Sequence, residues 1–208
     1  MASAPPDPKA YFTEHLPAQF ERALRAQERA ADDARRVLDG MRAADTTIVV
    51  EVHGEGGGRF VLNVHGGRLA PGDAPAHPVA MTVAVQARPD FERLLRDAGD
   101  SALGFLGGLS GLAGEIRLTK DRLALLGGLA GTLRFRVMGD EGFAVLTHFG
   151  SGAVKEPPDT EIRVAPDVYA DLRAGRLDAQ NAFLSGKLEL EGDVQLAMQL
   201  ALAALSPD

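Results

Sequence analysis

The sequence contains no cysteine and no tryptophan, and aromatic residues make up only 5% of its 208 positions. Without cysteine the chain forms no disulfide, has no thiol nucleophile and offers no thiolate ligand to a metal ion. The absence fits a protein of the cytoplasm, where disulfides are rare, although many exported proteins also lack cysteine. We therefore expect a cytoplasmic location.

Long apolar runs are absent as well. The best candidate, residues 102–118, contains five glycines, a glutamate and an arginine. It falls short of the roughly 20 consecutive apolar residues that a membrane-spanning helix needs. Residues 1–8 are rich in alanine and proline and lack the charged-then-apolar pattern of a signal peptide, so we expect a flexible arm there.

An excess of positive charge is also missing, because the formal net charge is -7. Nonspecific nucleic-acid binding depends on lysine and arginine side chains that neutralise phosphates, so we expect no nucleic-acid partner. The apolar fraction of 45% and the charged fraction of 25% are typical of a soluble globular protein. A chain of this length can bury a sizeable core, as one domain or as two small ones.

A pattern that occurs twice is the most informative feature that is present. Four positions recur at a spacing of 72 residues: Gly114, Ile116, Leu118 and Asp121 return as Gly186, Leu188, Leu190 and Asp193. Other matches follow in the same order, with His65 and His148 in equivalent slots and with Pro-Asp pairs at 89–90 and 166–167. Such self-similarity indicates an internal duplication. We predict a first copy over residues 45–130 and a second over 131–208.

Residues 1–44 precede both copies. A helix of about 22 residues is predicted from Pro17 to near Gly40, because apolar residues recur there at helical spacing. Its apolar stripe is narrow, so a short coiled coil is the alternative interpretation.

Alternating patterns predict the strands of the two copies. In the first copy they are 46–53, 59–65, 79–86 and 115–119, with a glycine turn at 54–58 and an irregular loop at 70–78. A helix should begin at Pro89, and another should cover 123–129. In the second copy the strands are 132–138, 143–149, 160–165 and 187–191. A helix should run from Pro166 to near Gly175, and Asp193 should cap the last helix.

Residues 181–198 resemble the sterol carrier protein 2 (SCP-2) lipid-binding domain family. The resemblance depends on the runs Gln180-Asn-Ala-Phe183, Gly186-Lys-Leu-Glu-Leu190, Gly192-Asp193 and Leu196-Ala-Met-Gln-Leu200, and on Leu177. It covers 131–205 well and 45–130 more weakly, through the repeat. It implies an α+β fold with mainly antiparallel sheets covered by helices, here as a tandem pseudo-repeat with a long N-terminal helix.

The family's proteins enclose an apolar tunnel for lipids, and the resemblance implies eight ligand-contacting residues here. They are Ala182, Phe183 and Gly186 at the tunnel end, Leu188 and Leu190 on the sheet, and Leu196, Met198 and Leu200 on the last helix. The first copy departs from the motif at 108–114, where it lacks the phenylalanine. One shared cavity and two separate cavities are therefore both open.

Catalytic and metal-binding patterns are weak in this sequence. The five histidines show neither metal-ligand spacing nor an i,i+4 pair with a glutamate, so we predict no metal site. Ser110 and Ser185 lack a visible histidine–aspartate arrangement, and we expect neither an enzyme nor a cofactor.

The resulting hypothesis is non-catalytic carriage of an apolar ligand such as a sterol, a fatty acyl chain, a phospholipid or a prenyl lipid. The partners expected are this lipid-like molecule, a membrane in transient contact, and a second copy of the chain in a homodimer. Two alternatives are an accessory scaffold that presents prenyl-lipid intermediates to biosynthetic enzymes, and a dimerisation module with a filled core and no ligand.

Overall fold

The computed structural model describes residues 7–109 and 116–205. It divides the chain into two compact units, Met1–Asp39 and Gly40–Asp208. The arm predicted at 1–8 and the glycine-rich departure from the motif at 108–114 lie mostly outside the described residues. The predicted boundary between two copies falls inside the second unit and remains a prediction.

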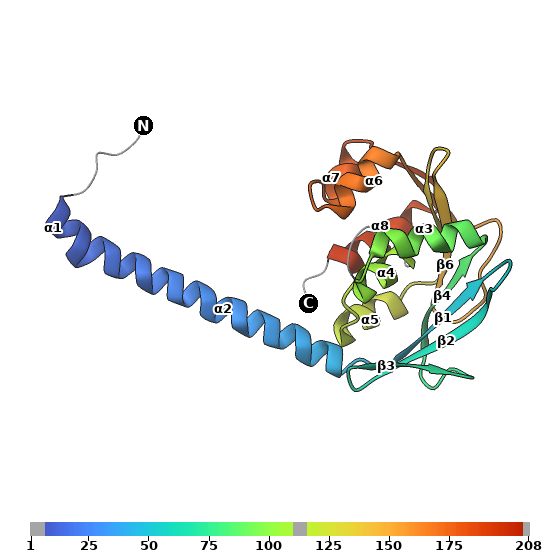
Figure 1. The fold of residues 1–208 in the computed structure, drawn as a ribbon, viewed down its shortest axis with the longest axis horizontal. Helices are drawn as coiled ribbons and strands as arrows, with labels where there is room; N and C mark the ends of the chain where they lie inside the picture. Colours follow the sequence, from blue (N-terminus) through green and yellow to red (C-terminus); the bar gives the residue numbers. More distant parts are fainter. Residues whose placement is uncertain (1–6, 110–115, 206–208) are drawn as a thin grey trace. The chain divides into compact units, whose positions relative to one another are not determined.

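Helices make up the first unit (Figure 1). They are α1 (Pro8–Ala10), the π-helical turn η1 (Tyr11–His15) and α2 (Leu16–Arg42), which extends three residues into the second unit. The long N-terminal helix predicted from Pro17 is therefore confirmed, with an end two residues beyond Gly40. Among the described residues, no helix is long and apolar enough to cross a membrane.

The second unit is built on one eight-stranded sheet with the order β3-β2-β1-β4-β6-β5-β7-β8. The strands are β1 (Thr46–Val52), β2 (Gly58–His65), β3 (Arg68–Gly72), β4 (Val79–Val85), β5 (Gly131–Val137), β6 (Phe143–Phe149), β7 (Thr160–Val164) and β8 (Leu188–Gly192). Within the described residues the β1–β4 and β5–β7 pairs are parallel, and the other strand pairs are antiparallel. The predicted α+β class with mainly antiparallel pairing is confirmed, but both halves share a single sheet because β4 pairs with β6.

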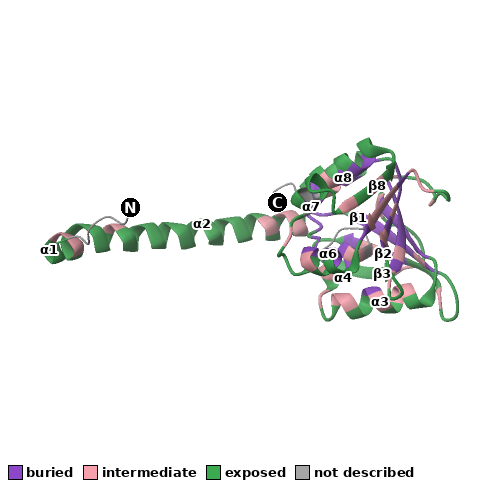
Figure 2. Ribbon diagram, turned by 90° about the horizontal axis from the view of Figure 1, so that it is seen from above, coloured by how far each residue is buried: buried purple, intermediate pink, exposed green. Residues whose placement is uncertain are grey.

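The helices of this unit gather on one face of the sheet (Figures 1 and 2). They are α3 (Arg88–Ala98), α4 (Ala102–Leu109), α5 (Lys120–Gly127), α6 (Pro166–Arg173), α7 (Ala179–Leu184) and α8 (Val194–Leu205). Strand residues alternate between the two faces, so Ile48, Val50 and Val52 all point toward the helices and are buried. Leu94, Leu126 and other helix residues complete this core.

Two sequence-based predictions about strands were wrong. Part of the loop predicted at 70–78 forms the edge strand β3, where Pro71 is tolerated because it lies on a sheet edge. Residues 116–119 belong to no strand, although Ile116 and Leu118 are buried as their alternation suggested. In the sheet β4 pairs with β1 on one side and with β6 on the other, so neither edge of β4 is open to a further strand.

Each half of the sheet contains a hairpin, and the two hairpins have the same kind of turn. Gly54 and Gly139 have positive φ angles of 96° and 95°, which glycine adopts without strain. The Gly57 N–H donates to the Gly54 carbonyl at 3.1 Å, and the Gly142 N–H donates to the Gly139 carbonyl at 3.0 Å. The first strand of each hairpin also pairs with a parallel strand: β1 pairs with β4, and β5 pairs with β7.

A buried threonine occupies the same place in both hairpins. Thr47 Oγ1 bonds to Asn63 on the neighbouring strand at 2.7 Å and accepts from the His77 N–H at 3.2 Å. Thr132 Oγ1 bonds to His148 Nδ1 at 3.0 Å and accepts from the Lys155 N–H at 3.0 Å. The segments before β4 and β7 are thereby tied to the sheet in the same way. The counterpart of His148 is thus Asn63 and not His65, which corrects the predicted equivalence, while the duplication itself stays a prediction.

Candidate functional site

Strand β8 carries two of the eight predicted ligand-contacting residues on the helix side of the sheet. Leu188 lies opposite Val164, and Leu190 lies opposite Ile162 in the β7–β8 register. Val164 is buried, but Leu188 and Leu190 are only half-buried. The apolar face of the sheet therefore continues to its β8 edge, where its cover is incomplete.

Helix α8 follows β8 through a short capped turn. The Asp193 carboxylate accepts hydrogen bonds from the Gln195 N–H at 2.9 Å and from the Leu196 N–H at 3.2 Å, which confirms Asp193 as the cap. Because this cap begins the helix directly after the strand, α8 lies close to β7, with which it is in contact.

Opposite sides of α8 have different surroundings. Leu196 and Leu200 are buried together with Ala197 and Ala203. On the other side Val194, Met198 and Leu202 follow one another at intervals of four residues and are exposed, Met198 by 55%. We call these three residues the α8 stripe. Such spacing places them on one side of the helix, so α8 presents apolar surface both inward and outward.

Helix α7 and the turn that follows it contribute the remaining predicted residues. Its N-terminus is capped by Asp178, which accepts from the Asn181 N–H at 2.8 Å. Ala182 is fully buried, whereas Phe183 is 39% exposed. Gly186 has a positive φ of 68°, and this turn lets the Lys187 N–H bond back to the Ala182 carbonyl at 2.9 Å on the way to β8.

The eight predicted residues therefore fall into three groups by exposure. Ala182, Leu196 and Leu200 are buried in the core, Leu188 and Leu190 are half-buried, and Phe183, Gly186 and Met198 are exposed. The buried group stabilises the fold. The exposed and half-buried apolar side chains are those that can contact a ligand without rearrangement of the core.

Charged residues occupy the opposite face of the same sheet edge. Since Ile162 and Leu190 face the helices, their neighbours Glu161 and Glu191 face away. Arg163 bonds to Glu161 at 2.9 Å and to Glu191 at 2.8 Å. Burial acts to raise the pKa of Glu161, but the Arg163 hydrogen bond and the surrounding arginine charges outweigh burial and lower it. The polar face is thus stable as ion pairs, and the apolar candidates all belong to the helix side.

An aromatic group under α6 was not singled out from the sequence. Tyr169 lies 5.4 Å from Phe143 and 6.0 Å from Phe135, measured between ring centroids. Burial raises the pKa of the Tyr169 hydroxyl, and the nearby Asp97 carboxylate raises it further. Tyr169 consequently stays protonated and donates a hydrogen bond. Its near neighbours are core residues, so the alternation of the strands was the signal that could have found this group.

The hydroxyl of Ser185 is used by the helix that carries it. It donates to the Asn181 carbonyl at 2.6 Å and closes the end of α7. Among the described residues, Asp45, His65 and His77 form a group with the donor atoms of a metal site. The spacing of the histidines in the sequence did not reveal it, because its members come from three different strand ends.

The molecule is thus an α+β protein in which helices cover one face of a mixed sheet and leave apolar side chains accessible at the β8 edge. Residues 113–204 match the model of the SCP-2 sterol transfer family. This match confirms, for this part of the chain, the resemblance predicted from the motifs.

Several solved structures are similar to this chain over part of its length. Sterol Carrier Protein 2 Like 2 from Aedes aegypti is 23% identical, and the match covers 35% of this chain and 72% of that one, with a TM-score of 0.28. The sterol carrier protein domain 2 of Helicoverpa armigera is 26% identical, with coverages of 40% and 76% and a TM-score of 0.29. Sterol Carrier Protein 2 from Yarrowia lipolytica is 16% identical, with coverages of 55% and 88% and a TM-score of 0.29. No curated protein gives a significant match.

Proposed function

We propose that the protein binds an apolar, lipid-like molecule against the β8 edge of its sheet and carries it without a covalent step. The family match over 113–204 favours lipid binding and transfer. The observation that carries the proposal for this chain is the exposure of large apolar side chains on α7 and α8, together with the half-covered leucines of β8.

Exposed apolar surface is costly when it has no partner. Each buried apolar side chain of this size contributes about 1.5–3 kcal/mol relative to its exposed state. Phe183, Leu184, Met198 and Leu202 are all at least 39% exposed. A bound acyl or prenyl chain that covered several of them would gain a corresponding part of this free energy.

The opposite surface of the same edge supports an apolar ligand on the helix side. The helix side offers Leu188 and Leu190, whereas the other face offers the ion pairs of Glu161, Arg163 and Glu191. A ligand without charge along its chain gains nothing from the ion-paired face. An apolar chain therefore favours the helix side.

Native mass spectrometry of the purified protein, before and after extraction with organic solvent, tests whether it holds a lipid. Titration of the extracted protein with a fluorescent fatty acid then measures the affinity. We expect saturable uptake by the extracted protein. A protein that carries no lipid and takes up no fluorescent fatty acid would refute the proposal.

Variants locate the site. Phe183→Ser and Met198→Glu should each weaken fatty-acid binding, because they remove exposed apolar surface without disturbing buried residues. Leu69→Glu is a matched control, since Leu69 is 49% exposed on β3 at the opposite edge of the sheet. Equal affinities for all three variants and the wild type would place the ligand elsewhere.

Two further measurements separate carriage from the alternatives. Transfer of a fluorescent lipid between vesicles should be accelerated by the wild type and less so by Met198→Glu. Light scattering after size exclusion measures the oligomeric state. A dimer that Met198→Glu converts to a monomer, together with no lipid uptake, would assign the α8 stripe to self-association instead.

A further inference from the structure

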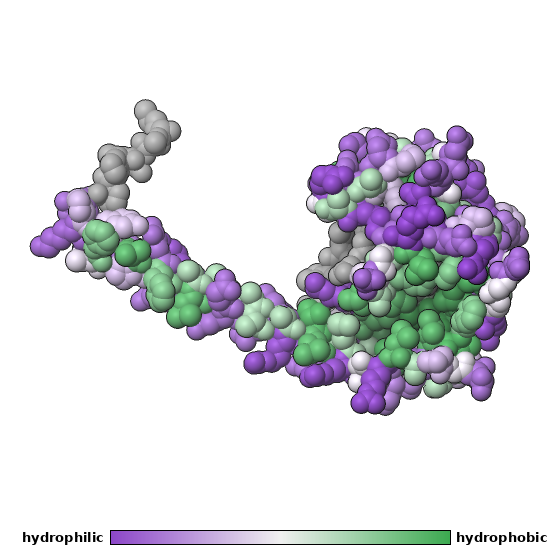
Figure 3. Space-filling view, viewed as in Figure 1, coloured by the Kyte–Doolittle hydropathy of each residue, from purple (hydrophilic) through white to green (hydrophobic). Residues whose placement is uncertain are grey.

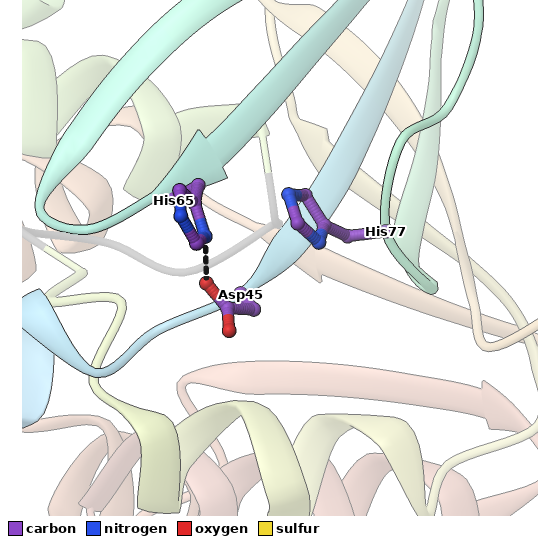
Figure 4. A group of neighbouring side chains, drawn as sticks. All are labelled: Asp45, His65 and His77. Atoms are coloured by element: carbon purple, nitrogen blue, oxygen red, sulfur yellow. Dashed lines mark hydrogen bonds and ion pairs between the residues drawn. The ribbon is translucent and has the colours of Figure 1, made fainter.

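Two histidines and an aspartate converge at one end of the sheet, far in sequence from the SCP-2 motif (Figure 4). Asp45 Oδ1 lies 2.6 Å from His65 Nδ1. The His65 and His77 rings are stacked, with centroids 5.3 Å apart and an angle of 11° between their planes. One donor atom from each of the three residues lies within 4.8 Å of the other two.

The backbone of the sheet fixes this convergence. Thr46 pairs with Val64, so the preceding Asp45 stands opposite His65 at the end of the antiparallel β1–β2 pair. On the other side of β1, the Thr47 N–H donates to the Pro78 carbonyl at 3.0 Å, and the His77 N–H donates to Thr47 Oγ1 at 3.2 Å. The backbone at Asp45 is therefore flanked by the two segments that carry His65 and His77.

The spacing suits a small transition-metal ion. Bonds of about 2.0–2.1 Å to imidazole nitrogen and carboxylate oxygen place the ligand atoms of a tetrahedral ion about 3.3 Å apart. Here His65 Nδ1 and Asp45 Oδ1 are 2.6 Å apart, and one donor atom of each residue lies within 4.8 Å of those of the other two. The spacing of about 3.3 Å falls inside this range. Asp45 and His65 are exposed, with side-chain exposures of 54% and 72%, so they can turn by the small amount required.

The donor set indicates the class of ion. Two imidazoles and one carboxylate suit zinc and similar borderline ions, whereas calcium and magnesium prefer oxygen ligands. Exposure leaves room for water at the remaining coordination positions. Arg68 lies opposite His65 in the β2–β3 register. It adds no ligand and opposes the charge of the ion.

We propose that Asp45, His65 and His77 form a binding site for a zinc-like divalent transition-metal ion. The ion joins the start of β1 to the end of β2 and to the segment that leads into β4. Its bonds to the three side chains tie three strand ends together. Because it binds the folded sheet, it raises the stability of the fold.

The test uses full-length protein from which any affinity tag has been removed. Isothermal titration with Zn²⁺ should give one ion per chain, and Co²⁺ should produce a visible absorption band from d–d transitions. His65→Ala, His77→Ala and Asp45→Asn should each lower the Zn²⁺ affinity at least tenfold, since even loss of an outer-shell partner costs 10–100-fold. His53→Ala is the matched control, because His53 is an exposed histidine that follows the other end of β1.

Thermal unfolding provides a second readout that does not depend on a spectroscopic signal. Zn²⁺ should raise the melting temperature of the wild type and of His53→Ala, but not that of His77→Ala. All three ligand side chains are outside the core, so each variant should fold. No Zn²⁺ uptake, or uptake that is unchanged in both His65→Ala and His77→Ala, would overturn the proposal.

Discussion

Leu196 and Met198 lie two residues apart on α8, yet we expect them to have opposite roles. Leu196 is 3% exposed and Met198 is 55% exposed. Leu196→Ala should therefore destabilise the fold strongly, while Met198→Ala should affect ligand binding and leave stability nearly unchanged.

The magnitude follows from what surrounds Leu196. A Cβ atom on Gly131 would come within 2.8 Å of Leu196 Cδ2, so the leucine packs directly onto the backbone at the start of β5. Gly131 has no side chain that could move into the space left by alanine. Buried leucine-to-alanine changes cost 2–5 kcal/mol, and we expect about 3 kcal/mol here. For a protein of this size that lowers the melting temperature by about 6–12 °C.

Urea unfolding followed by circular dichroism, together with differential scanning calorimetry, measures both variants. Met198→Ala should remain within about 0.5 kcal/mol of the wild type, as expected for an exposed side chain. A loss below 1 kcal/mol for Leu196→Ala, or equal losses for the two variants, would refute the assignment of the two sides of α8. It would mean that α8 turns a different side toward the sheet.

Other regions give predictions of the same kind. The Thr132 N–H donates to the Asp159 carboxylate at 2.7 Å, and this hydrogen bond is the main reason that the pKa of Asp159 is lowered in the folded protein. The ionised carboxylate therefore stabilises the fold above the unfolded-state pKa of about 3.9. This stabilisation is lost as the pH falls through the lower pKa of the folded state. Urea unfolding at pH 5 and pH 3 should show a larger loss for the wild type than for Asp159→Asn; equal losses contradict this. Asp193→Ala should cost about 1 kcal/mol through loss of the α8 cap, and Asp193→Asn should retain most of it in the same assay. Gly142→Ala should cost more than about 1 kcal/mol because its Cβ would overlap the Val137 carbonyl oxygen, whereas Gly127→Ala, with no atom within 4 Å, should cost nothing.

The sequence predicted those elements whose signals are local. The Asp193 cap, the Pro-Asp starts of α3 and α6, and the glycine turn of the first hairpin each depend on a few adjacent residues and were confirmed. The eight candidate site residues were placed by motif alone. Their division into buried, half-buried and exposed groups required the packing of α7 and α8, which no local pattern contains.

The errors arose where distant segments compete for the same place. Residues 116–119 alternate as a strand does, and Ile116 and Leu118 are buried as expected. An alternating segment forms a strand only where a neighbouring strand has an unpaired edge. β4 offers none, because it pairs with β1 on one side and with β6 on the other. Residues 188–192, which alternate in a similar way, pair with one edge of β7 and form β8 there.

The same competition accounts for the unequal chemistry of the two halves. Because β8 is a sheet edge, the segment that carries Leu188 and Leu190 remains only half-covered. The upstream segment with the similar motif lies outside the sheet and buries Ile116 and Leu118 in the core instead. A similar motif thus yields accessible apolar surface in one half and core in the other. Ligand binding is therefore expected at the β8 edge and not beside β4.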